Sequence, residues 1–196
     1  MIRFRSALAL LLLLITAPVA ARGAAPVRVT LQTSAGPILV ELAMDRAPIT
    51  AGNFLRYVDE KRFDGTVFYR AARTRNAATQ GFIQGGIRHS LRRSRPPIAH
   101  EPTSRTGLKH VDGALSMARG EPGSAMGDFF ITVGAAPAMD ARPGNPGYAV
   151  FGRVVAGMGV VRRILAGKTY ADRGSGAMKG QMLIQPVTIV TARRAR

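Results

Sequence analysis

Apolar and polar side chains alternate with a period of two in residues 27–32. After a turn-forming segment at residues 34–36, residues 38–42 repeat the alternation. A period of two places the apolar side chains on one face of an extended chain. The pattern therefore predicts two half-buried strands joined as a β-hairpin.

The rest of the chain predicts two helices. One begins at Pro48, because a proline in the first turn removes no intrahelical hydrogen bond, and the other covers residues 158–165, where apolar residues recur at helical spacing. Residues 71–81 are polar and aperiodic, and residues 87–107 are basic, so both are predicted as loops. Strands or short returns to the core are predicted at residues 66–69, 82–83, 114–118, 129–133, 148–154 and 185–191.

These short strands follow one another along the chain and do not alternate with helices. Consecutive strands favour a mainly β fold, either an antiparallel barrel or a sandwich, with the two helices at its ends. No internal repeat or linker divides residues 22–196. The sequence therefore predicts one domain over this range.

The N-terminus has the pattern of a targeting segment. Arg3 and Arg5 precede an apolar run over residues 7–15, and small residues follow up to Ala21. This order is typical of a secretory signal peptide over residues 1–21, cleaved before Arg22. The alternative is an uncleaved membrane anchor, although the run is shorter than the ~20 residues that span a bilayer. An exported protein is expected, periplasmic if the source is Gram-negative.

The chain is strongly basic, with a formal net charge of +17 and 28 Lys and Arg residues against 11 Asp and Glu. Such a charge attracts polyanions in general. The basic residues are dispersed, with local clusters at residues 92–95 and 193–196. Few aromatic residues lie beside these clusters, so stacking on nucleic acid bases is not expected. A dedicated nucleic-acid surface remains only a rival interpretation.

Several catalytic chemistries are excluded by the residues themselves. The chain has no cysteine, which rules out disulfides, thiolate metal sites and cysteine nucleophiles. It has no nucleophile elbow, Walker loop or His-Glu-x-x-His helix. The separation of His100 and His110 matches no usual zinc pattern. A metal site is therefore not expected.

Several separate motifs occur in a characteristic order. They are Ala47-Pro48 with Asn53-Phe54, Phe68-Tyr69-Arg70, Gln84-Gly85-Gly86, Leu115-Ser116-Met117-Ala118, Phe129-Phe130-Ile131 and Val150-Phe151-Gly152-Arg153-Val154. On these motifs the chain resembles the cyclophilin-type peptidyl-prolyl isomerases over roughly residues 27–192. The resemblance implies a closed eight-stranded antiparallel β-barrel capped by two α-helices, with a peptide groove on its outer face.

The resemblance also implies a set of site residues. Arg70 matches the catalytic arginine of the family. The implied substrate-binding residues are Phe68, Phe82, Gln84, Ala118, Arg119, Asp128, Phe130, Met139 and Tyr148. The implied partners are proline-containing polypeptides, bound by a monomer that keeps no membrane anchor after signal cleavage.

Some positions depart from the commonest pattern of the family. Asp128 replaces a Gln, Tyr148 a His and Arg119 an Asn. Asp128 is expected either to pair with Arg70 and orient it, or to hold it away from substrate. Ala138 stands where many relatives have a Trp that contacts cyclosporin, so weak cyclosporin binding is expected.

The implied reaction suits these residue types, because it breaks no bond and so needs no nucleophile, metal or cofactor. Rotation about a peptide bond crosses a barrier of ~18–20 kcal/mol because C–N resonance is lost in the twisted state. At X-Pro bonds the two isomers differ by only ~0.5–1 kcal/mol, so both are populated. A guanidinium that donates to the prolyl carbonyl or nitrogen stabilises the twisted state preferentially. The alternative is a non-catalytic chaperone that binds proline peptides in the same groove.

Overall fold

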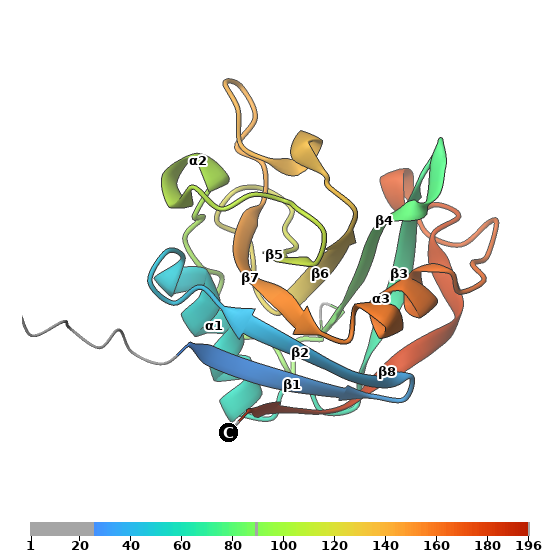
Figure 1. Cartoon of the computed structure of the whole chain (residues 1–196), viewed down its shortest axis with the longest axis horizontal. Helices are drawn as coiled ribbons and strands as arrows, with labels where there is room; N and C mark the ends of the chain where they lie inside the picture. Colours follow the sequence, from blue (N-terminus) through green and yellow to red (C-terminus); the bar gives the residue numbers. More distant parts are fainter. Residues whose placement is uncertain (1–25, 89, 196) are drawn as a thin grey trace, which may run out of the picture.

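Eight antiparallel strands form a closed barrel in the computed structural model, which describes residues 26–88 and 90–195 (Figure 1). The strands are β1 (Val27–Thr33), β2 (Gly36–Leu42), β3 (Thr66–Thr74), β4 (Ala77–Gly86), β5 (Ala114–Met117), β6 (Asp128–Val133), β7 (Ala149–Ala156) and β8 (Met182–Arg194). Their order around the barrel is β1-β2-β7-β5-β6-β4-β3-β8. The barrel confirms the predicted fold class, whereas the predicted signal peptide, residues 1–21, lies outside the described residues.

The first and last strands close the barrel. β1 pairs with β2 on one side and with β8 on the other, where Thr30 lies opposite Arg193. Closure leaves no unpaired sheet edge, which removes the usual site of edge-to-edge aggregation. The hairpin predicted from residues 27–42 is therefore the β1–β2 pair, joined at Thr33 and Gly36.

Two helices close opposite ends of the barrel (Figure 1). Helix α1 (Pro48–Asp59) lies beside the C-terminal end of β8, where Asp59 pairs with Arg194. Helix α3 (Met158–Leu165) lies against the β1–β2 turn, where Arg163 donates to the carbonyl of Ala35. Both were predicted from the sequence. No helix within the described residues has the length and apolar character needed to cross a bilayer.

Three shorter helices lie in the described parts of the connections. They are the one-turn α2 (Thr103–Thr106) and the 3₁₀ turns η1 (Pro137–Met139) and η2 (Gly176–Met178). The basic segment 87–107, predicted as a loop, therefore ends in a single helical turn. Such a turn is too short to produce a recognisable helical periodicity.

Residues 71–81 are not a loop, which corrects the prediction. β3 continues to Thr74 and β4 begins at Ala77, so this segment forms the end of a β-hairpin. Arg73 fixes the hairpin against α3 by donating from Nε to the carbonyl of Leu165 at 2.9 Å. The apolar alternation is missing because residues 74–76 and 78–80 are exposed and face no core.

A cluster of aromatic rings fills the barrel beside α1. Phe54 of α1 meets Phe129 of β6 edge to face at 5.2 Å, with an interplanar angle of 89°. Phe54 also packs against Phe151 and Phe63, and all of these side chains are almost completely buried. Buried aromatic pairs of this geometry stabilise a core by more than the burial of their apolar area alone would.

The N-terminus of α1 is capped by a carboxylate from a distant segment. Ala47 provides no side-chain cap. Glu101, which is 3% exposed, accepts hydrogen bonds from the backbone N–H of Ile49 at 3.2 Å and from that of Thr50 at 2.7 Å. A negative charge at this position satisfies free N–H groups and complements the helix dipole. Glu101 thus fixes the segment that leads into α2 onto the end of the barrel.

Candidate active site

A groove of about 1110 Å³ opens on the outer side of β3, β4 and β6. On β4, Phe82 and Gln84 face the groove, while the intervening Ile83 is buried in the core. The groove collects all of the predicted site residues except Phe68. They are Arg70, Phe82, Gln84, Ala118, Arg119, Asp128, Phe130, Met139 and Tyr148.

Phe68 is corrected from a substrate-binding residue to a core residue. Its side chain is 0% exposed and meets the ring of Phe129 edge to face at 5.7 Å inside the barrel. The register shifts between Phe68 and Arg70, where Phe68 pairs with Gly85 and Arg70 with Gln84. An irregularity of this kind allows consecutive side chains to share one face. Tyr69 and Arg70 therefore both line the groove, while Phe68 points inward.

The Arg70 guanidinium is held by partners from two different segments. Nη1 donates to Oε1 of Gln84 at 2.8 Å, and Nε donates to Oε1 of Gln181 at 2.8 Å. Nη2 lies 3.4 Å from the carbonyl oxygen of Ala177, and the guanidinium carbon is 4.9 Å from the centre of the Phe82 ring. Partial burial lowers the pKa of Arg70 from its ordinary value. A guanidinium remains charged in proteins and has five N–H donors, so it retains donors for a ligand.

Hydrogen bonds connect Arg70 to Asp128 through two intermediate side chains. Nε2 of Gln84 donates to the Tyr69 hydroxyl at 2.8 Å, and this hydroxyl donates to Oδ1 of Asp128 at 3.3 Å. Burial and the nearby carboxylate raise the pKa of Tyr69, so its hydroxyl stays protonated. Oδ1 of Asp128 also accepts the backbone N–H of Arg88 at 2.8 Å. Asp128 is therefore connected to Arg70 through Tyr69 and Gln84, whereas the Arg70 guanidinium itself donates to Gln84, Gln181 and Ala177.

Aromatic rings and Met139 form an apolar wall beside Arg70. The ring centres of Phe82 and Phe130 lie 5.2 Å apart, and Tyr148 meets Phe130 edge to face with ring centres 5.5 Å apart. The backbone N–H of Tyr148 donates to the carbonyl of Met139 at 3.0 Å. An apolar surface with a few directed polar groups is the usual construction of a binding site. This wall is suited to a small apolar ring placed next to the guanidinium.

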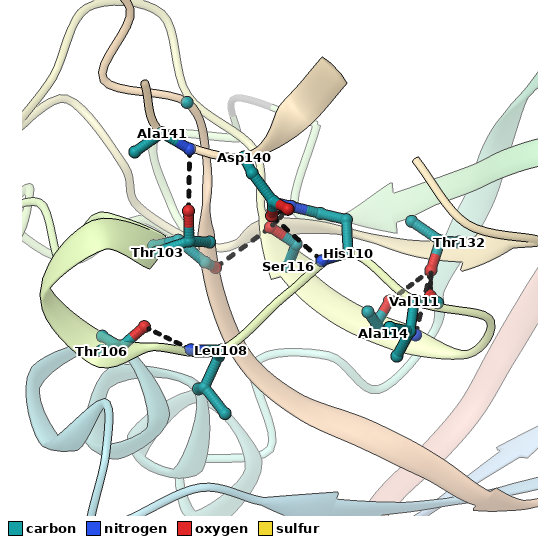
Figure 2. Close-up of polar contacts among 12 residues, drawn as sticks. Thr103, Thr106, Leu108, His110, Val111, Ala114, Ser116, Thr132, Asp140 and Ala141 are labelled. Carbon is teal, nitrogen blue, oxygen red and sulfur yellow. Dashed lines mark hydrogen bonds and ion pairs between the residues drawn. The ribbon is translucent and has the colours of Figure 1, made fainter. Parts of the chain in front are cut away.

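A buried histidine supports this wall from behind, as Figure 2 shows for its polar contacts. His110 stacks on Phe130 with ring centres 5.8 Å apart and an interplanar angle of 7°. Its Nδ1 lies 2.7 Å from Oδ1 of Asp140, and its Nε2 lies 2.9 Å from Oγ of Ser116. Because a carboxylate only accepts, Nδ1 carries a proton. Burial lowers the pKa of His110, so the ring favours its neutral form.

Ala118 and Arg119 form the rim of the groove. The N–H of Ala118 donates to the carbonyl of Asp128 at 2.9 Å. The guanidinium of Arg119 donates to the carbonyl of Gly147 and to that of Gly120, and lies 5.0 Å from the centre of the Tyr148 ring. The Arg119 side chain therefore braces the loop that precedes β7.

Comparison with known proteins identifies the family. A family model described as cyclophilin type peptidyl-prolyl cis-trans isomerase/CLD matches residues 28–193. The chain belongs to the cyclophilin-type peptidyl-prolyl isomerases. It catalyses the cis-trans isomerisation of X-Pro peptide bonds, and the non-catalytic alternative is not favoured.

Similar cyclophilins occur in bacteria. A peptidyl-prolyl cis-trans isomerase of Acinetobacter baylyi is 37% identical over 149 residues, which cover 74% of this chain and 76% of the relative. One of Streptomyces antibioticus is 37% identical over 172 residues, covering 84% and 96% respectively. Among solved structures, a cyclophilin type isomerase of Cryptosporidium parvum, crystallised with the dipeptide Ala-Pro, has a TM-score of 0.68 at 20% identity. It covers 86% of this chain and 99% of its own, which supports the fold.

One wall of the cyclophilin groove was missed by sequence reasoning. It comes from the connection between α3 and β8, and includes Tyr170, Arg173 and Ala177, while Gln181 of the same connection holds Arg70. This connection is exposed, largely irregular and without apolar periodicity. Tyr69 was also missed, although it stands within the quoted motif Phe68-Tyr69-Arg70. The position of Tyr69 in this motif could have identified it as a groove residue, whereas no sequence pattern marks the α3–β8 connection.

Proposed function

We propose that Arg70 is the catalytic residue of this isomerase and that Phe82, Phe130 and Met139 hold the proline ring. The observation that carries the proposal is the clamped guanidinium, which Gln84 and Gln181 hold directly beside an apolar wall. Because the donors are already oriented, they need little reorganisation when the substrate twists.

The proposed mechanism breaks no covalent bond. As the C–N bond rotates, the prolyl nitrogen loses resonance and gains a localised lone pair. A donor that meets this lone pair or the prolyl carbonyl binds the twisted state more strongly than either planar isomer. Arg70 supplies that donor, and Gln84 and Tyr69 hold its orientation.

The test is the cis-to-trans exchange of an Ala-Xaa-Pro-Phe peptide, measured by NMR with the chain from residue 22. Arg70→Ala is expected to lose at least about 100-fold in kcat/KM, the size of effect expected on removing a preorganised donor to a developing charge. Arg75→Ala is a charge-matched control, because Arg75 is exposed at the β3–β4 turn and does not line the groove. Full activity of Arg70→Ala would refute the assignment.

The proposal for the place of action rests on the N-terminal sequence. We infer that residues 1–21 direct export, that the mature enzyme is a monomer, and that its clients are exported polypeptides whose X-Pro bonds limit folding. The support is the basic, apolar and small-residue order of this segment. Expression in a Gram-negative host followed by N-terminal sequencing of the periplasmic fraction tests it. A chain that keeps Met1 and stays in the cytoplasm would contradict export.

A further inference from the structure

Arginine–aromatic stacking is concentrated in the groove. All such pairs found within the described part of the chain have both members in its lining. The pairs, with the distance from guanidinium carbon to ring centre, are Arg70 over Phe82 (4.9 Å), Arg88 over Tyr69 (5.6 Å), Arg119 over Tyr148 (5.0 Å) and Arg173 over Tyr170 (4.0 Å).

Seven described arginines outside the groove form ion pairs with carboxylates. Every arginine–carboxylate ion pair between described residues lies outside the groove lining. These pairs are Arg28 and Arg153 with Glu41, Arg62 and Arg95 with Glu60, Arg162 with Asp112, Arg193 with Asp64, and Arg194 with Asp59.

The lining of the groove is correspondingly unbalanced in charge. Among the described residues, this lining contains four arginines but a single carboxylate, Asp128, which is only 6% exposed and accepts from Tyr69 and from the backbone of Arg88. In contrast, Arg88 and Arg173 are exposed. A concave surface lined by charges of one sign concentrates the opposite charge.

The exposed cations come from separate segments of the groove wall. Arg88 follows the end of β4 and stacks on Tyr69, and Arg173 lies in the α3–β8 connection that also provides Ala177 beside Arg70. Stacking on a ring holds a guanidinium in place while its edge remains able to donate. A planar guanidinium matches the two oxygens of a carboxylate, which makes Asp and Glu side chains its natural partners.

We propose that the groove selects polypeptides with Asp or Glu close to the X-Pro bond, and that Arg88 and Arg173 are the residues that select them. This inference rests on the proposed function of the groove, since an acidic flank is recognised only while the proline lies beside Arg70. It names the class of client as acidic proline segments.

The first test compares kcat/KM for three peptides that share an Ala-Ala-Pro-Phe centre and differ in their flanks. The flanks carry Glu, Ser or Lys on both sides, and exchange is measured at 20 mM and 300 mM NaCl. An exposed ion pair is worth roughly a two- to five-fold preference, so the order Glu, Ser, Lys is expected at low salt. The preference is expected to shrink at high salt because exposed charges are screened.

The second test uses the charge-reversal variants Arg88→Glu and Arg173→Glu. Each is expected to reduce the ratio of kcat/KM for the Glu-flanked peptide to that for the Ser-flanked peptide at least two-fold. Arg56→Glu is the matched control, because Arg56 is exposed on α1, none of whose residues line the groove. This control changes the net charge equally and is expected to keep the ratio of the parent. Because both peptides are measured with the same variant, a loss of folded protein lowers both values of kcat/KM equally and leaves their ratio unchanged.

The outcomes separate this inference from the proposed function. If the parent accelerates all three peptides equally, the acidic preference is refuted and the isomerase assignment stands. If Arg56→Glu reduces the ratio as much as Arg88→Glu, the preference comes from net charge and the selecting role of Arg88 and Arg173 is refuted. If Arg70→Ala isomerises the Ser-flanked peptide normally, the proposed catalytic groove is itself wrong.

Discussion

The Nε atom of Arg70 donates a 2.8 Å hydrogen bond to Oε1 of Gln181, although 111 positions separate the two residues in the chain. Gln84 accepts from the same guanidinium at Nη1. The two amides fix both the position and the plane of the guanidinium before a substrate binds. Gln181 is therefore a positioning residue, placed by the connection between α3 and β8.

Removal of the Gln181 amide is expected to reduce catalysis more than stability. Gln181→Ala frees the Arg70 guanidinium to rotate, and kcat/KM for a neutral peptide is expected to fall about 5- to 10-fold, the equivalent of one lost hydrogen bond. Gln181→Glu keeps an acceptor for Nε and is expected to restore most of the activity. Gln185→Ala is the control, because Gln185 is exposed on β8 and does not line the groove. Equal losses in the Ala and Glu variants would show that Oε1 does not position Arg70.

The buried carboxylate at the start of α1 is expected to contribute strongly to stability. Glu101→Ala leaves two backbone N–H groups and the Thr50 hydroxyl without their acceptor, at a cost of about 2–4 kcal/mol in the free energy of unfolding. Glu101→Gln keeps the shape and one acceptor, so a smaller loss is expected. Urea unfolding followed by circular dichroism measures both. Equal stability of the parent and Glu101→Ala would contradict the capping role.

The protein is expected to lose stability in weak acid because of the buried His110. Burial lowers its pKa in the folded state below the ordinary value of 6.5. The unfolded chain therefore binds a proton first as the pH falls below about 6.5, and the free energy of unfolding decreases by at most ~1.4 kcal/mol per pH unit until the folded pKa is reached. Above this window the contribution is fully present.

The pH effect is measured by urea unfolding between pH 7.5 and 5.5. His110→Asn removes the titrating group and is expected to flatten the dependence, whatever its effect on absolute stability. His100→Asn is the control, because His100 lies on the surface at the carbonyl of Pro146. The carboxylates with lowered pKa values, such as Glu41 and Asp64, act at lower pH and do not interfere. An unchanged slope in His110→Asn would assign the effect to another group.

Cyclosporin is expected to bind weakly. Ala138 lies exposed on η1, next to Met139 of the groove, and offers a methyl group where many relatives have an indole ring. Loss of a large aromatic contact at the centre of an interface commonly costs 2 kcal/mol or more, about 30-fold in affinity. Inhibition of peptide isomerisation measures the affinity, and Ala138→Trp is expected to strengthen it. Nanomolar inhibition of the parent would contradict the prediction.

The alternation of apolar and polar residues predicts some strands of this protein correctly and others wrongly. The alternation in residues 27–42 predicts a hairpin correctly because the two faces of a half-buried strand meet different surroundings. The same rule fails at residues 71–81, since the end of the β3–β4 hairpin projects beyond the core and both faces of its tip are exposed. The misassignment of Phe68 has a related origin, because a shift of register beside Arg70 cannot be seen from the motif alone.

By itself, the sequence determined the number and type of the main elements, the family, and nine of the residues that line the groove. Only the tertiary structure decided how Arg70 is held, which aromatic rings carry Arg88 and Arg173, and which carboxylate caps α1. Periodicity reports the surroundings of each face of a strand or helix, which is a local property. Pairs such as Arg70–Gln181 and Thr50–Glu101 depend on where the barrel brings distant segments together, so no local pattern encodes them.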